Sequence, residues 1–228
     1  MWYSAHSNER ERCTIINILC FGDSNTFGTN PAGGRWPLEV RWTGVLQQLL
    51  GPGYRVIEEG CGGRTTIFED ELERDKNGRA QLRVALRSHR PLDLVILMLG
   101  TNDMKHRFGM LPVDVAEAAA GLGRLVERYE YGANYPVPRV LLVSPIEIGD
   151  GISRSRFTGF TEEAAAYSRE FAPLFEARAK AHGWLYLNAA SVAHPSEQDH
   201  LHMEAADHRA LAQALAQIVK GAFEGEAQ

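Results

Sequence analysis

The sequence has few cysteines and no long apolar run. Its three cysteines, Cys13, Cys20 and Cys61, are an odd number without CxxC spacing. That pattern argues against a disulfide framework and against a structural zinc site. No segment approaches the roughly 20 apolar residues of a membrane-spanning helix, and no signal-like apolar run follows a basic start. We therefore expect a cytoplasmic protein with no membrane partner.

Neither sign of charge dominates the chain. The 24 Lys and Arg residues and 29 Asp and Glu residues give a net charge of -5, and no long block of one sign could follow a polyanion. Nucleic acid is therefore not an expected partner. The 228 residues, 44% of them hydrophobic, suit a single domain over residues 1–228. Within it, residues 1–13 include a mixed-sign NERER run and are expected to form an N-terminal extension.

Short apolar segments alternate with segments of helical periodicity. The predicted strands are 15–21, 54–57, 92–99, 140–143 and 184–187, and the predicted helices are 42–50, 80–89, 113–129, 161–181 and 204–223. Parallel strands need crossovers, and right-handed crossovers place helices on both faces of a sheet. The pattern therefore predicts an α/β fold, a flavodoxin-like three-layer α/β/α sandwich. Its five-stranded parallel sheet should have the order 2-1-3-4-5.

Four polar segments follow predicted strands: GDSNTFG at 22–28, GCGGRTT at 60–66, GTND at 100–103 and DHLH at 199–202. Each is weak alone, because a serine in a turn usually caps a helix and glycine pairs often serve only the backbone. Ligands of open α/β sheets bind outside the carboxyl ends of the strands. Convergence of all four segments at that edge favours one functional site.

These segments resemble the four blocks of the SGNH, or GDSL, hydrolases, in the expected order. The resemblance is carried by the GDS block at 22–24, the Gly63 turn, the GTND block and the Asp199/His202 pair, and it covers almost the whole chain. RWTGVL at 41–46, VIEEG at 56–60, RTT at 64–66 and LDLVILMLGTND at 92–103 are similar to the bacterial arylesterase and acyltransferase branch. The resemblance implies a serine esterase.

The resemblance assigns a catalytic triad to Ser24, Asp199 and His202. Serine at an ordinary pKa is a poor nucleophile, so His202 would take its proton during attack on an ester and later return it to the leaving alcohol. Asp199 would orient the imidazole. His200 is the rival base, but its adjacency to Asp199 directs its side chain elsewhere.

The same resemblance assigns an oxyanion hole and a substrate pocket. The oxyanion donors are the Ser24 and Gly63 amides and the Asn102 side chain. The substrate-pocket candidates are Asp23, Phe27, Thr101, Ile146 and Leu201. Three departures from the family pattern stand out: Asn25 replaces a leucine outside the chemistry, Phe27 replaces a tryptophan, and the 144–147 segment lacks a proline run.

The leading hypothesis is a serine esterase for short acyl esters that works through an acyl-enzyme, with acyl transfer to alcohols as a further outcome. A carbohydrate acetylesterase of the same mechanism is the closest alternative. A flavodoxin-like FMN-binding module is an alternative of another class, because a polar loop after the first strand can cradle phosphate. A catalytically dead scaffold is disfavoured, since every required residue is present. We expect no cofactor and no metal, and the resemblance suggests a homo-oligomer.

Overall fold

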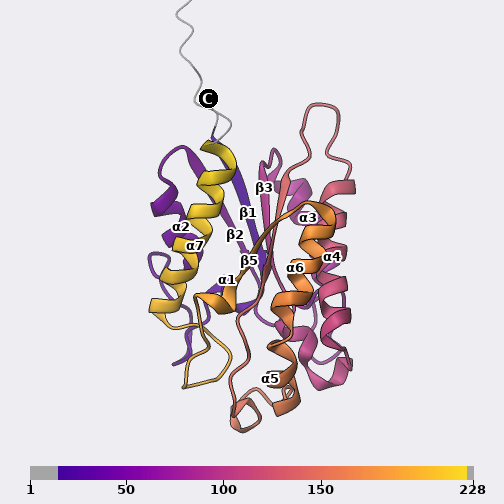
Figure 1. Cartoon of the computed structure of the whole chain (residues 1–228), viewed down its shortest axis with the longest axis vertical. Helices are drawn as coiled ribbons and strands as arrows, with labels where there is room; N and C mark the ends of the chain where they lie inside the picture. The colour runs from indigo at the N-terminus through magenta and orange to yellow at the C-terminus, as the bar shows by residue number, and fades with distance from the viewer. Residues whose placement is uncertain (1–14, 225–228) are drawn as a thin grey trace, which may run out of the picture.

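A computed structural model describes residues 15–224 (Figure 1). The expected N-terminal extension at 1–13 lies outside the described residues. Within the described residues, five parallel strands form one sheet in the order β2-β1-β3-β4-β5, which confirms the predicted topology. The strands are β1 (Ile16–Gly22), β2 (Tyr54–Gly60), β3 (Leu94–Met98), β4 (Arg139–Ser144) and β5 (Leu185–Asn188).

Helices cover both faces of the sheet, as Figure 1 shows with the sheet edge toward the viewer. One face carries α2 (Trp42–Leu50) and α7 (Ala205–Glu224), and the other carries α3 (Gly78–His89), α4 (Pro112–Arg128) and α6 (Phe171–His182). The short helices are α1 (Ser24–Phe27) and α5 (Glu162–Ser168), and α5 lies at the lower end of the view. Four 3₁₀ turns complete the described elements: Thr101–Met104, His106–Phe108, Ile152–Arg154 and Ala189–Ser191.

The central strands are apolar because both of their faces are buried. On β1, Leu19 and Phe21 join the core under α3, α4 and α6, whereas Ile18 and Cys20 join the core under α2 and α7. Strands covered on both faces read as continuous apolar runs. Edge strand β2 instead continues through Glu58 and Glu59 to Gly60, past the predicted end, because its pairing with β1 runs to Gly60 and Glu58 has a polar partner in Arg41.

The helix predicted at 161–181 is two helices in the structure, and that prediction was wrong. Helix α5 ends at Ser168, and α6 begins at Phe171. Pro173 explains the break, because it has no backbone N–H and its ring would clash with the Arg169 carbonyl in a continuous helix. The Ser168 hydroxyl accepts the Ile148 N–H at 2.9 Å. Ser168, the last residue of α5, thereby links this helix to the segment at 146–159.

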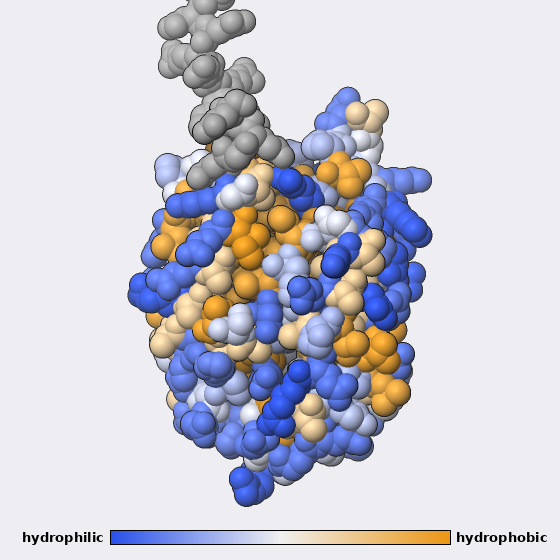
Figure 2. Space-filling view, in the orientation of Figure 1, coloured by the Kyte–Doolittle hydropathy of each residue, from blue (hydrophilic) through white to orange (hydrophobic). Residues whose placement is uncertain are grey.

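The face toward the viewer is apolar between two helices and mostly hydrophilic at its lower end (Figure 2). Apolar surface is visible between α6 and α7, where edge strand β5 lies with Leu185 and Leu187 only partly buried (Figure 2). The lower part of the view, which holds α5, is mostly hydrophilic. Among the described residues, no helix is long and apolar enough to cross a membrane.

Candidate active site

The first polar turn presents Ser24 at the carboxyl edge of the sheet. Strand β1 ends at Gly22, and Ser24 is the first residue of α1. The Asp23 carboxylate caps this helix by accepting the Asn25 N–H at 3.0 Å. Burial raises the pKa of Asp23 to about 6, although the Asn25 amide and His202 act in the opposite direction. A side chain at Gly60 would place its Cβ 2.0 Å from the Phe27 nitrogen, so glycine there lets α1 pack against β2.

The second turn holds Asp199 and His202 as a bonded pair. His202 Nδ1 lies 2.7 Å from Asp199 Oδ2, while Asp199 Oδ1 accepts the backbone N–H groups of Leu201 and His202 at 3.0 and 2.9 Å. Burial opposes ionisation of Asp199, but these hydrogen bonds outweigh it and hold the pKa of Asp199 below its ordinary value. The Phe157 ring packs edge-on to the imidazole, with centroids 5.2 Å apart. The imidazole is therefore held through Nδ1, and within the described part of the chain its Nε2 forms no hydrogen bond.

Ser24 and His202 line the same cavity of about 620 Å³. They come from segments that are far apart in the sequence, and both are buried, with exposures of 8% and 2%. Gly63 and Asn102 line the same cavity. The structure thus brings together the nucleophile, base and oxyanion candidates, and Asp199 adjoins them through His202.

Asn25 joins the two turns, a role that the sequence did not predict. Its Nδ2 donates to the Leu201 carbonyl at 3.2 Å, and its Oδ1 accepts the Met203 N–H at 3.1 Å. These bonds hold the chain on either side of His202 while Asn25 follows Ser24 directly. The only signal in the sequence was an amide at a position where the resembled family has leucine. Asn25, expected to lie outside the chemistry, therefore links the Ser24 turn to the chain on either side of His202.

The oxyanion candidates are held by bonds between neighbouring loops. Gly63 has a φ of 78°, a backbone conformation that favours glycine. Asn102 Nδ2 donates to the Arg64 carbonyl at 3.2 Å, which uses one of its two hydrogens. Next to it, Asp103 accepts the Thr66 N–H at 3.0 Å and is fully buried. Burial raises the pKa of Asp103 to about 7, against the opposing hydrogen bonds from Thr66.

The predicted pocket residues do not all lie at the cavity. Of the five, Leu201 lines it, whereas Asp23, Thr101 and Ile146 are buried and do not line it. The Phe27 ring instead lies under the Arg35 guanidinium, 4.0 Å from its carbon. The described residues that line the cavity also include Phe157 and Phe160 from the segment that follows β4.

His200 is directed away from the cavity. It has a φ of 61°, and its carbonyl accepts the Gly149 N–H at 2.8 Å. A Cβ at Gly149 or Gly151 would lie 3.1 to 3.2 Å from the nearest atom of the His200 side chain. The imidazole of His200 therefore packs over the 149–151 turn. His200 is not one of the described residues that line the cavity.

The cavity wall also carries a charged cluster that the sequence does not predict. Buried Asp70 accepts Arg107 Nε at 3.1 Å and Lys105 Nζ at 3.4 Å, and Lys105 also lies 3.3 Å from Glu73. Burial opposes the charge on Asp70, but the bonds from Arg107 and Lys105 keep its pKa below its ordinary value. This cluster anchors the 67–77 segment so that Glu73 approaches Gly63. The mixed charges of 69–76 were visible in the sequence, but their contacts depend on the fold.

A parallel α/β sandwich with these four blocks at one sheet edge is the architecture that the motif resemblance implies for a carboxylic ester hydrolase. The profile of the GDSL-like lipase/acylhydrolase family matches residues 20–211. The chain therefore belongs to this family, and the resemblance inferred from the motifs is confirmed.

Solved structures support the same assignment. The chain is 38% identical to the aryl esterase of M. smegmatis, with a TM-score of 0.84, and the match covers 90% of this chain and 99% of that one. It is 35% identical to a carbohydrate acetylesterase from Sinorhizobium meliloti, with a TM-score of 0.86 and coverage of 91% and 100%. A search of curated proteins gives no match.

Proposed function

We propose that this chain is a serine esterase for short acyl esters, with Ser24, His202 and Asp199 as its triad. The observation that carries the proposal is the Asp199–His202 bond of 2.7 Å on an imidazole that shares a cavity with Ser24. Attack of Ser24 Oγ on the ester carbonyl transfers the hydroxyl proton to His202 Nε2. Collapse of the tetrahedral intermediate releases the alcohol, which takes that proton, and leaves an acyl-enzyme.

Water completes the proposed cycle. His202 accepts a proton from the water as it attacks the acyl-enzyme, the acid leaves and Ser24 regains its hydrogen. An alcohol in place of water would give acyl transfer. The developing oxyanion would be stabilised by the Ser24 and Gly63 amides and by the second hydrogen of Asn102 Nδ2. Each such donor is typically worth about 3 kcal/mol of transition-state stabilisation.

The cavity walls support a short acyl group and a polar alcohol. Phe157 and Phe160 limit the apolar part of the cavity, whereas Glu73, Lys105 and Arg107 give another part polar character. A hydroxylated alcohol could hydrogen-bond to such groups. The similarity to a carbohydrate acetylesterase supports sugar acetates as a second substrate class, handled by the same mechanism.

The FMN alternative is disfavoured by the charge of the first turn. Asp23 caps α1 next to Ser24, and Asp199 lies beside His202. Two carboxylates near the turn would repel a phosphate, which cationic groups and free backbone amides usually bind. The homo-oligomer and the cytoplasmic location stay predictions from the sequence.

The test is a panel of nitrophenyl esters from acetate to octanoate, together with acetylated sugars. We expect Ser24→Ala to abolish turnover and labelling by an organophosphonate, while Ser88→Ala, an exposed serine on α3, keeps both. Each methylene that fits an apolar pocket can contribute about 0.8 kcal/mol. The proposed walls predict a fall in kcat/KM beyond about four carbons. Labelling of Ser24→Ala at the same site would refute the nucleophile, and a kcat/KM that climbs to octanoate would refute the short acyl pocket.

A further inference from the structure

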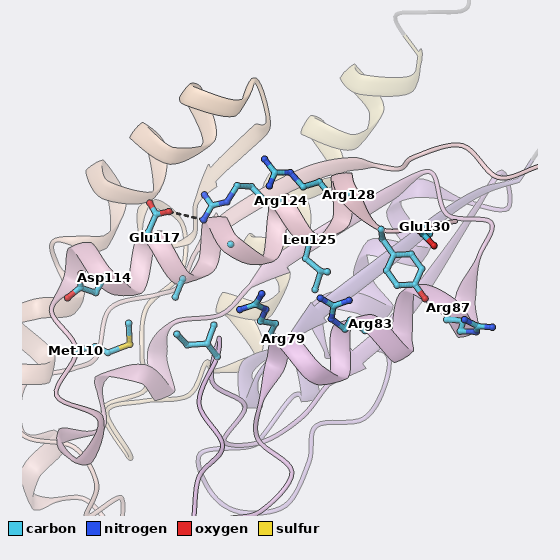
Figure 3. A pocket seen from close by; sticks show the side chains of 14 residues that line it. Arg79, Arg83, Arg87, Met110, Asp114, Glu117, Arg124, Leu125, Arg128 and Glu130 are labelled. Atoms are coloured by element: carbon cyan, nitrogen blue, oxygen red, sulfur yellow. Dashed lines mark hydrogen bonds and ion pairs between the residues drawn. The ribbon is translucent and has the colours of Figure 1, made fainter. Parts of the chain in front are cut away.

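A second cavity, larger than the active-site cavity, lies between α3 and α4. It is a groove of about 830 Å³, shown in Figure 3. Helix α4 packs against α6 on its other side, and the groove lies along the side that faces α3. Its lining includes five arginines from the two helices: Arg79, Arg83, Arg87, Arg124 and Arg128. None of the residues proposed for ester hydrolysis lines this groove.

The arginines of α3 form a row that has no ion-pair partner within residues 15–224. Arg79, Arg83 and Arg87 recur every four residues, so successive positions rise by about 6 Å along one helix face. Figure 3 shows Arg79 and Arg83 extending from α3 toward α4. Within the described part of the chain, no carboxylate forms an ion pair with any of the three. Like charges four residues apart destabilise a helix, so the row does not help the fold.

The acidic residues of the groove do not neutralise this row. Glu117 is held by Arg124 at 2.8 Å and by Arg178 at 2.7 Å. Burial opposes the charge on Glu117, but the two arginines outweigh it and keep its pKa below its ordinary value. Asp114 and Glu130 lie at opposite ends of the groove (Figure 3). The middle of the groove is therefore a local positive region in a chain of net charge -5.

The rest of the lining is apolar or small. It includes Leu125, Ala118 and Gly121 on α4, with Ile67 and Met110 at neighbouring positions. Leu125 lies opposite Arg79 and Arg83 in Figure 3. A bare inorganic anion would leave this surface unused, whereas an organic group could cover it.

We propose that this groove binds a small organic molecule that carries two or more adjacent phosphate groups. Arginine is suited to phosphate because its guanidinium can donate two parallel hydrogen bonds to neighbouring oxygens. Arg79 and Arg83 hold the phosphates in the positive middle of the groove, and Leu125 and its neighbours contact the organic part. The volume lies within the range of about 300–1,000 Å³ that is usual for small-molecule sites.

The test measures binding of ATP and of inorganic tripolyphosphate to the full chain by calorimetry, without divalent metal. We expect both to bind, ATP more tightly, with affinities that fall as NaCl rises from about 50 to about 200 mM. The variant Arg79→Gln/Arg83→Gln should lose about tenfold or more in affinity for both probes. The matched control is Arg55→Gln/Arg209→Gln, which removes two exposed arginines from β2 and α7 and should bind within about twofold of the native chain.

Four results would overturn the proposal. The first is the absence of binding heat with either probe up to about 5 mM. The second is an equal loss of affinity in the two double variants, and the third is equal affinity of the native chain for ATP and tripolyphosphate. The fourth is a dimer in sedimentation that Arg79→Gln/Arg83→Gln dissociates, because it would assign the groove to a second copy of the chain. Leu125→Asn tests the contact with the organic part of the ligand alone. It should weaken the binding of ATP and leave the binding of tripolyphosphate unchanged.

Discussion

The two cavities differ in how their polar groups are held. In the cavity of about 620 Å³, Ser24, Asn102 and His202 are buried, and hydrogen bonds fix the Asn102 and His202 side chains and the backbone of Ser24. In the groove of about 830 Å³, Arg79 and Arg83 are exposed and unpaired among the described residues. Bond-making chemistry needs fixed orientation, whereas long cationic side chains can adapt to an anion. In this chain, side-chain order and not cavity size therefore distinguishes the proposed catalytic site from the proposed binding groove.

The strongest test of this difference removes the His202 imidazole, which is hydrogen-bonded to Asp199. His202→Ala should lower kcat for a nitrophenyl acetate by about a thousandfold or more, because Ser24 loses its base. The control is His200→Ala, whose side chain packs over the 149–151 turn. It should stay within about threefold of the native enzyme. Steady-state kinetics on both variants measure this, and a larger loss in His200→Ala would move the base to His200.

The next test removes the hydrogen bonds from Asn25 to Leu201 and Met203 while leaving the proposed triad residues unchanged. Asn25→Leu removes both bonds to the chain around His202, so we expect kcat to fall by about ten- to a hundredfold while KM changes little. Thr26→Val is the matched control, because the Thr26 hydroxyl in the same turn has no partner among the described residues. Parallel losses in kcat and in thermal stability for both variants would indicate a merely structural role for Asn25.

The buried acid beside the site offers a thermodynamic test. Burial raises the pKa of Asp103 from 3.8 to about 7. The folded state therefore binds more protons than the unfolded state between these values, and the contribution of Asp103 to stability falls as pH rises from about 4 to about 7. Asp103→Asn should remove this pH dependence. For the native chain, Asp103 should lower the free energy of unfolding by about 1.4 kcal/mol per pH unit across this range. Urea unfolding of both chains across this pH range measures it, and parallel curves would contradict the raised pKa.

The sequence predicted the parts of this molecule that depend on local pattern. Strand burial was enough to predict the apolar run on β1, and the order of the motifs was enough to predict the blocks around Ser24 and His202. The bridge from Asn25 to Leu201 spans 176 positions, and the contacts of Asp70 with Lys105 and Arg107 depend on how two loops meet. No periodicity encodes such contacts. Pro173 lies inside the predicted helix at 161–181, and that prediction was wrong because a proline in a helix interior breaks the hydrogen-bond ladder.

The smallest expected effect concerns the groove, where the arginines should not stabilise the fold. Arg83 has like charges four residues away on both sides, at Arg79 and Arg87. Each such pair costs about 0.2–0.5 kcal/mol in a helix, and glutamine has nearly the helix propensity of arginine. Arg83→Gln should therefore raise the free energy of unfolding by a few tenths of a kcal/mol at low salt. The gain should disappear near 1 M NaCl, where screening acts within about 3 Å. Denaturant unfolding at the two salt concentrations measures the change. A loss of more than about 1 kcal/mol would mean that Arg83 supports the fold, and the contrast between the two cavities would then fail.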